Sequence, residues 1–134
     1  MKTHYWLLTV LYCAGLFWLS NQPFDQRPEL EIPGLDKLIH AILYGGLAVL
    51  VSNGIRRSGK ETDPKWQFWA PILFATLYGL SDETHQYFVP NRSFDPLDLL
   101  ADSAGALLAQ VLLCFSIWRI PPKDVFSRNH QGPG

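Results

Sequence analysis

Three short stretches of the sequence hold most of the side chains that could carry out chemistry. They are Asp36, Lys37, His40 and Tyr44; Asp82, Glu83, His85 and Gln86; and Arg92, Asp95, Asp98 and Asp102. Carboxyl and imidazole groups can transfer protons in acid–base catalysis. Lysine and arginine can hold an anionic group such as a phosphate or a carboxylate. We therefore take these residues as the candidate functional site.

The spacing of these residues predicts three polar stripes on helices. The stripes are Asp36, His40 and Tyr44; Asp82, Glu83 and Gln86; and Asp95, Asp98, Asp102 and Gly105. Residues three or four apart are neighbours on one face of a helix. Asp95 also has a structural role available, because it precedes Pro96 and can cap the helix that begins there. Tyr44 and Gln86 are expected to serve as hydrogen-bond partners within the cluster.

One hypothesis is an enzyme in which Glu83 is the general acid or base. His40 would be the second proton carrier, because imidazole titrates closest to neutral pH. Lys37 and Arg92 would hold an anionic group of the substrate, and Asp98 would orient His40 or Arg92. A variant adds a divalent metal held by His40, Glu83, His85 and Asp98. No HExxH or similar signature fixes such a site, so no metal is predicted.

The competing hypothesis is a binding or structural protein without catalysis. Lys37 and Arg92 would then form buried ion pairs that tie the ends of three helices together. The carboxylates outnumber these two cations, and this excess favours a proton, a cation or a cationic ligand. Ion or solute transport is a third and weaker hypothesis, because beyond the cluster only scattered polar residues such as Ser52, Asn53 and Thr76 occur. The residues leave open whether the protein is an enzyme.

Four apolar blocks must position these side chains. They predict an all-α membrane protein, a four-transmembrane-helix bundle with spans at about 5–20, 36–54, 66–84 and 96–118. A soluble four-helix bundle is the alternative, but its helices would carry a polar stripe toward solvent. The first and last blocks show no such stripe. A cleaved signal peptide is the competing interpretation of the first block, and no small-x-small cleavage site follows it.

The basic residues predict the orientation of the spans. Arg56, Arg57, Lys60 and Lys65 lie between the second and third spans, Lys2 precedes the first, and Arg119, Lys123 and Arg128 follow the fourth. The other two connections carry only Arg27 and Arg92. Positive loops stay in the cytoplasm, so an N-in/C-in topology is predicted. The three polar stretches then meet at the extracytoplasmic face.

Length and composition limit the remaining possibilities. A chain of 134 residues forms one domain, here 1–120, followed by a tail at 121–134 that is predicted to be disordered. The formal net charge of -1 excludes a basic surface for nucleic acid. Cys13 and Cys114 lie within apolar blocks and are interpreted as small hydrophobic residues. No cofactor is indicated, and the oligomeric state is left open.

Three motifs in order resemble those of the VanZ-like family of bacterial membrane proteins. They are Asp36-Lys37-x-x-His40-x-x-x-Tyr44, then Tyr78-Gly79-x-x-Asp82-Glu83-x-His85-Gln86-x-Phe88-x-Pro90-x-Arg92, then Asp95-x-x-Asp98-x-x-x-Asp102-x-x-Gly105. The resemblance covers about residues 35–110. It implies a multi-pass protein of the bacterial cytoplasmic (inner) membrane, whose partner besides the lipid bilayer is an envelope ligand such as a lipid-linked or cell-wall precursor. The founding member is linked to low-level teicoplanin resistance, so an effect on glycopeptide susceptibility is part of this expectation.

Overall fold

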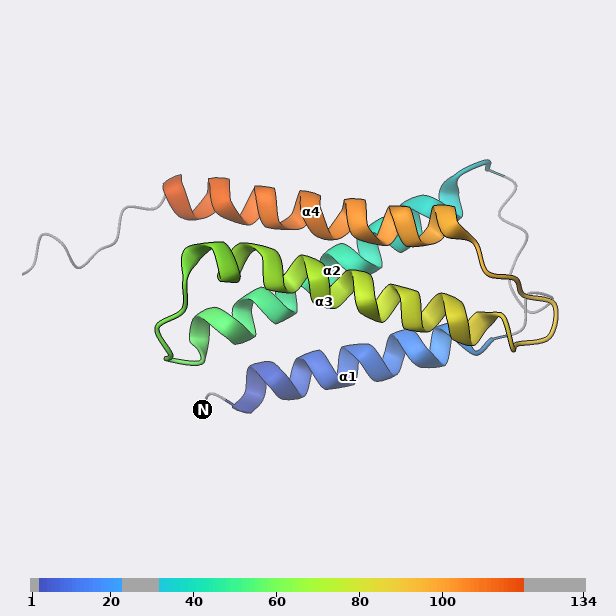
Figure 1. Cartoon of the computed structure of the whole chain (residues 1–134), viewed down its shortest axis with the longest axis horizontal. Coiled ribbons are helices and arrows are strands. Elements are labelled where there is room, and N and C mark those ends of the chain that lie inside the picture. Colours follow the sequence, from blue (N-terminus) through green and yellow to red (C-terminus); the bar gives the residue numbers. More distant parts are fainter. Residues whose placement is uncertain (1–2, 23–31, 120–134) are drawn as a thin grey trace, which may run out of the picture.

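The computed structural model describes residues 3–22 and 32–119, and these residues form four helices and no strand. The helices are α1 (Thr3–Ser20), α2 (Leu35–Arg57), α3 (Pro64–Gln86) and α4 (Pro96–Arg119). They lie side by side along one long axis (Figure 1). The four helices coincide with the four predicted blocks, which confirms the all-α prediction. The predicted tail at 121–134, and Lys2, Arg27, Lys123 and Arg128, lie outside the described residues.

Two helix starts follow from local sequence chemistry. Asp63 caps α3 by accepting a hydrogen bond from the Lys65 amide at 2.8 Å. Asp95 caps α4 in the same way, through the Leu97 amide at 2.9 Å. In both cases proline is the first helical residue, where its missing N–H group costs nothing. The capping role predicted for Asp95 is therefore confirmed.

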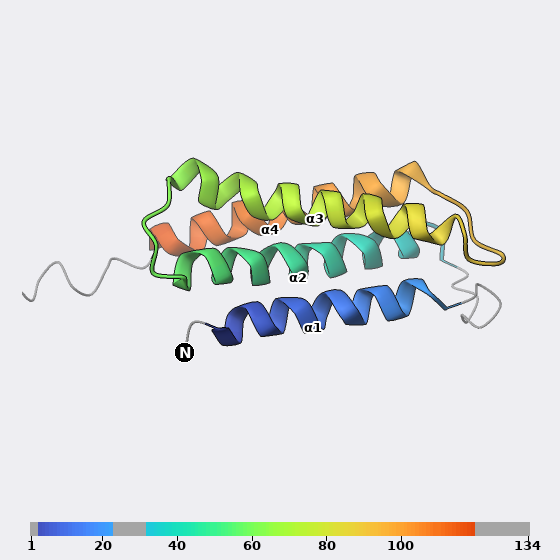
Figure 2. The ribbon, with the colours of Figure 1, turned by 60° about the horizontal axis from the view of Figure 1, so that its bottom comes forward.

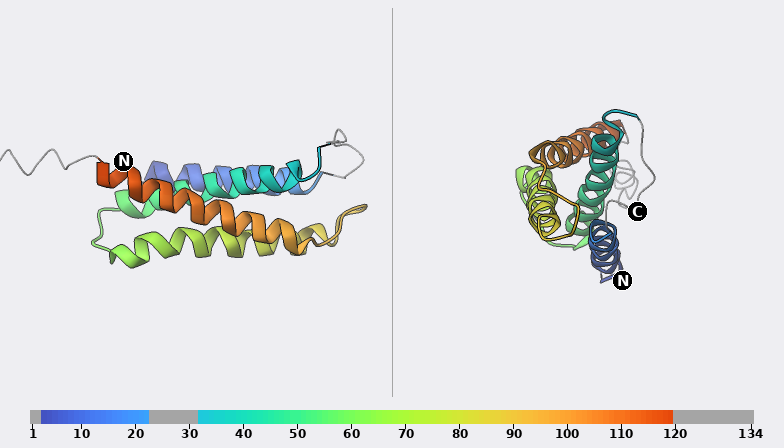
Figure 3. Two further views of the ribbon diagram at one scale, coloured as in Figure 1. Left: turned by 90° about the horizontal axis from the view of Figure 1, so that it is seen from above. Right: turned by 90° about the vertical axis from the view of Figure 1, so that its right-hand side faces the viewer.

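Helix α2 is the centre of the bundle, and it packs against α1, α3 and α4. Figures 2 and 3 show α1 at one side, next to α2 and away from α4. Hydrogen bonds from tyrosines help to tie α1 to the other helices. The Tyr12 hydroxyl donates to the Leu43 carbonyl at 2.8 Å, and the Tyr78 hydroxyl donates to the Cys13 carbonyl at 2.7 Å.

Helices α2 and α4 approach each other through glycines. A Cβ atom added to Gly105 would overlap the backbone of Ala41, and one added to Gly45 would lie 3.1 Å from the Gly105 carbonyl oxygen. Small residues at such positions allow two helix backbones to come together. This close contact brings the first turn of α2 beside the first turns of α4, which is where the polar stripes lie.

The side chains that point outward are mostly apolar. Each helix exposes large residues, among them Leu7, Trp18, Ile42, Leu73, Leu77, Leu100, Leu108 and Phe115. The interior is narrow and contains small residues such as Ala48, Ala75 and Ala106, each fully buried. Two of the described helices, α2 and the 96–116 part of α4, are long and apolar enough to cross a membrane.

The two ends of the bundle carry different groups of polar residues. The start of α1, the α2–α3 loop and the end of α4 lie together at one end of the bundle, and the start of α2 and the α3–α4 loop lie at the other (Figure 1). Arg56, Arg57, Lys60 and Lys65 belong to the first end. The candidate site residues belong to the second.

Candidate functional site

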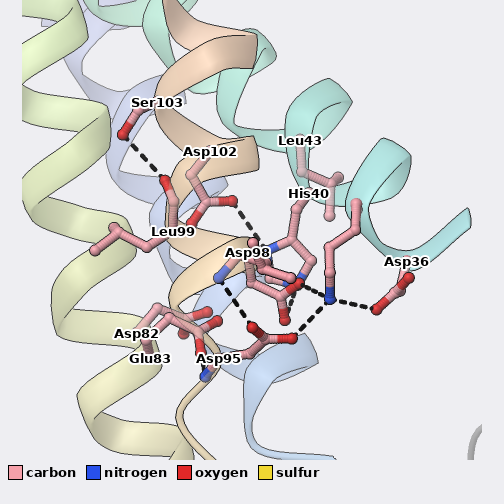
Figure 4. A network of polar contacts seen from close by, with 12 residues as sticks. Asp36, His40, Leu43, Asp82, Glu83, Asp95, Asp98, Leu99, Asp102 and Ser103 are labelled. Atoms are coloured by element: carbon pink, nitrogen blue, oxygen red, sulfur yellow. Dashed lines mark hydrogen bonds and ion pairs between the residues drawn. The ribbon is translucent and has the colours of Figure 1, made fainter. Parts of the chain in front are cut away.

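The first turns of α2 and α4 and the last turns of α3 meet in one polar cluster (Figure 4). The contacts below join seven of the predicted residues: Asp36, Lys37, His40, Glu83, Asp95, Asp98 and Asp102. Several of these side chains are deeply buried, and Glu83 and Asp102 are not exposed at all. Residues that are far apart in the sequence therefore form one site, at the predicted end of the bundle.

Lys37 connects three elements through one ammonium group. Its Nζ atom lies 2.9 Å from an oxygen of Asp36, 2.7 Å from Asp95 and 2.6 Å from Asp98. The Asp98 side chain is only 12% exposed, whereas Asp36 is 57% exposed. The neighbouring ammonium group holds the pKa of Asp95, in the α3–α4 loop, below its usual range. Lys37 therefore links α2 to the loop and to α4.

His40 lies between two carboxylates of α4. Its Nδ1 atom is 2.9 Å from Oδ1 of Asp102, and its Nε2 atom is 3.7 Å from Oδ2 of Asp98. Since the pair with Asp102 is best satisfied by a proton on Nδ1, Nε2 is assigned the free lone pair in the neutral ring. Gly79 makes this arrangement possible, because a Cβ atom there would press against the Asp102 carboxylate.

Glu83 is the side chain through which α3 joins the cluster. Its Oε2 atom accepts a hydrogen bond from the Asp95 amide at 3.0 Å, which ties α3 to the start of α4. Its Oε1 atom is buried and has no hydrogen-bond partner. A buried carboxylate oxygen without a partner is energetically unfavourable, so this atom is a place where a proton or a cation would be stabilised.

A second polar group lines a cavity next to the cluster. Gln86 donates to Asp82 at 3.1 Å and accepts a short hydrogen bond from Arg92, whose guanidinium also reaches the Ser20 and Gln22 carbonyls. The cavity has a volume of about 140 Å³. Its polar wall is formed by Ser20, Asp36, His40, Tyr44, Asp82, Gln86 and Arg92, and its apolar wall by Leu16, Leu19, Ile39 and Leu43.

Of the predicted residues, His85 is the one that points elsewhere. Its ring lies 4.8 Å from the Phe17 ring, and its Nε2 atom is 3.2 Å from Oδ1 of Asn21, both associated with α1. Donor atoms of His40, Glu83 and Asp98 lie within 4.8 Å of one another, and His85 is outside this group. Residues two apart in a helix do not share a face. Because Glu83 faces the interior of the bundle, His85 must point in another direction.

Two buried features, one in the cavity and one deeper in the bundle, were not predicted from the sequence. The apolar wall on α1 had no detectable signal, because that helix is apolar on all sides. Gln110 is fully buried, and its Nε2 atom donates to the Ala48 carbonyl at 3.3 Å. The sequence could have predicted the burial of Gln110. It lies eight residues after Asp102, so it continues the same polar stripe along the helix.

Comparison with known proteins addresses the family. Residues 5–119 match the VanZ/LLP1 family. Comparisons with curated proteins and with solved structures give no match. The matched region extends from the first turn of α1 to the last residue of α4 and includes every residue of the polar cluster. The chain therefore belongs to the VanZ/LLP1 family.

Proposed function

We propose that the chain crosses the bacterial cytoplasmic membrane four times, with both termini in the cytoplasm. The exposed apolar side chains on all four helices support this proposal, because a soluble bundle would direct its polar residues outward. The buried carboxylates also fit, since charged groups in membrane proteins face the interior of the bundle. The positive-inside rule assigns the end with Arg56, Arg57, Lys60 and Lys65 to the cytoplasm.

Cysteine labelling in intact cells tests this topology. In a chain whose Cys13 and Cys114 are replaced by serine, Ser93→Cys in the α3–α4 loop should react with a membrane-impermeant maleimide. Lys60→Cys in the α2–α3 loop should react only after the cells are permeabilised. The opposite pattern would reverse the proposed orientation, and equal labelling of both sites would exclude four spans.

We further propose that the cavity binds an envelope-related ligand that has an apolar and a polar part, such as a lipid-linked or cell-wall precursor. The observation that carries this proposal is the two-sided lining of the cavity, with leucine and isoleucine on one wall and His40, Gln86 and Arg92 on the other. A binding site of this kind holds an apolar ligand body and orients it with a few polar groups. Membership in the VanZ/LLP1 family fits this role and a link to glycopeptide susceptibility.

Neighbouring residues on α2 offer a matched pair for the test. Ile39 lines the cavity and is 38% exposed, whereas Leu38 is 54% exposed and does not line it. Ile39→Trp should fill the cavity and lower the amount of co-purified ligand, measured by mass spectrometry of extracted lipids, at least tenfold. Leu38→Trp should leave that amount unchanged. Equal retention of all lipid species by the two variants would contradict the proposal.

The second candidate is an enzyme in which Glu83 and His40 transfer protons to an envelope substrate. The unpartnered Oε1 atom of Glu83 favours it, since an acid–base group needs a lone pair that is not already engaged. The test compares envelope lipids and cell-wall precursors in cells with the native chain and with Glu83→Gln, at equal membrane levels. A species that changes only with the native chain supports catalysis. Identical profiles from two folded proteins would contradict it.

A further inference from the structure

Three potential metal ligands from three different helices converge in the cluster. The donor atoms of His40 on α2, Glu83 on α3 and Asp98 on α4 lie within 4.8 Å of one another. We propose that these residues bind one divalent transition-metal ion, Zn²⁺ or Mn²⁺, at this end of the bundle. The inference concerns the same site as the proposed function, but binding of the metal does not depend on the identity of the ligand.

The histidine is oriented as a metal ligand would be. Histidines that bind metals usually donate their other ring N–H to a carboxylate or carbonyl, which fixes the ring and leaves one nitrogen free. Here Nδ1 lies 2.9 Å from Asp102, and Nε2 points toward Asp98 at 3.7 Å. Asp102, the partner of Nδ1, is fully buried. It would therefore act as the supporting carboxylate behind the ligand.

Each of the two carboxylate ligands has one oxygen engaged by the protein and one available. Glu83 uses Oε2 to accept from the Asp95 amide, and its Oε1 atom is buried without a partner in a residue that is 0% exposed. Asp98 uses Oδ1 to hold the Lys37 ammonium, and its Oδ2 atom faces His40. Each carboxylate can therefore offer one oxygen to a metal while the other keeps its contact with the protein.

The charge of the carboxylates around His40 matches a dication. Glu83, Asp98 and Asp102 carry three negative charges when ionised, and the Lys37 ammonium offsets one of them. Two negative charges then remain on groups that are largely removed from water. Such charges need a partner, because isolated buried carboxylates are strongly disfavoured. A divalent ion would neutralise them while His40 stays neutral and binds through Nε2.

The donor set determines which ion is expected. One imidazole and two carboxylates suit Zn²⁺ or Mn²⁺ better than Mg²⁺ or Ca²⁺, which prefer oxygen alone. Two donors at about 2.1 Å from a metal are at most about 4.2 Å apart, and about 3.4 Å apart in a tetrahedral site. A pair of donors 4.8 Å apart would therefore move together by roughly 0.6–1.4 Å when the metal binds. Three protein ligands leave a coordination position open, and His40 also lines the cavity. That position would bind an anionic oxygen of the ligand.

The experiment measures metal binding by the purified full chain in detergent. The chain is stripped with a chelator, incubated with Zn²⁺, Mn²⁺, Mg²⁺ or Ca²⁺ separately, desalted and analysed by elemental mass spectrometry. Affinity is measured by competition with a chromophoric chelator. The native chain should retain one Zn²⁺ or Mn²⁺ ion, and Glu83→Gln or His40→Gln should lower the affinity at least a hundredfold. Asp102→Asn should lower it about 10–100-fold through the orientation of His40.

Asp36→Asn is the matched control. Asp36 contacts Lys37, as Asp98 does, but it is not one of the three proposed metal ligands. Its affinity should stay within threefold of that of the native chain. Pulsed electron paramagnetic resonance of the native chain with Mn²⁺ should also show coupling to an imidazole nitrogen, a readout that needs no variant to fold.

Three results would overturn the inference: no retained ion in the native chain, equal losses for Asp36→Asn and Glu83→Gln, or no nitrogen coupling. If the native chain binds no metal but Ile39→Trp still loses the co-purified lipid, metal binding is refuted and the proposed ligand binding is not affected.

Discussion

Replacing Lys37 by methionine should destabilise the bundle, because three carboxylates share its ammonium group. The Asp98 contact is the strongest of the three, at 2.6 Å with a side chain only 12% exposed. An ion pair between two charged groups in such a place is worth about 1.5–3 kcal/mol. The contacts with Asp36 and Asp95 are exposed to solvent, and each adds about 0–1 kcal/mol. The expected loss in the free energy of unfolding is therefore about 1.5–5 kcal/mol.

The assay is SDS titration of the purified chain in mixed micelles with a chelator present, followed by circular dichroism. Lys60→Met is the control, since Lys60 is exposed in the loop at the opposite end of the bundle. It should change the free energy of unfolding by no more than about 0.5 kcal/mol.

A double-mutant cycle isolates the pair of Lys37 and Asp98. Asp98→Asn removes the charge that Lys37→Met leaves without a partner, so the double variant should lose less stability than the two single losses combined. The expected coupling is about 1–2 kcal/mol. A loss below about 0.5 kcal/mol for Lys37→Met, or additive losses in the cycle, would refute the idea that this lysine joins the helix ends.

Three further predictions concern single residues. Gly105→Ala should destabilise the bundle by about 1–3 kcal/mol in the same titration, because its Cβ would overlap the Ala41 backbone, whereas Gly15→Ala meets no neighbour within 4 Å and should stabilise α1 by up to about 1 kcal/mol. Asp95→Asn should cost the same stability at pH 7 and pH 5 but progressively less below about pH 4. The reason is that a carboxyl whose folded pKa is lowered contributes fully above its usual pKa of about 3.9 and loses that contribution as the pH falls through the lower value. Gln110→Leu should lower stability by no more than about 1 kcal/mol, or raise it. The amide oxygen of Gln110 is buried without a partner, and leucine removes that unfavourable group.

The positions of the helices could be predicted from the sequence because their boundaries combine two independent signals. Long apolar blocks mark all four helices, and Asp95 followed by Pro96 marks the start of α4. The same signal, Asp63 followed by Pro64, lies two residues before the predicted start of α3. The observed helices begin and end within three residues of the predicted spans. The polar stripe on α4 was also predictable, because Asp98 and Asp102 are four residues apart. In the structure both of these residues are buried.

What the sequence could not predict depends on contacts between helices. The bond between Glu83 and the Asp95 amide involves a backbone group, which no residue pattern reveals. The side of α1 that faces the cavity was not predictable either, because an evenly apolar helix has no preferred face. Leu16 and Leu19 therefore became visible as cavity residues only once α1 was packed against α2.

The wide sequence separation of the cluster has a consequence for biosynthesis. Lys37 and its partner Asp95 are 58 residues apart, and His40 and Asp102 are 62 residues apart. At about 5–20 residues per second, the ribosome completes α2 several seconds before it makes the first turns of α4. In the proposed topology, α2 must wait in the membrane during that interval with its charged turn at the water interface. The cluster can close only after the last helix has been inserted, so truncation within α4 should leave a nascent chain that quality-control proteases recognise as incomplete.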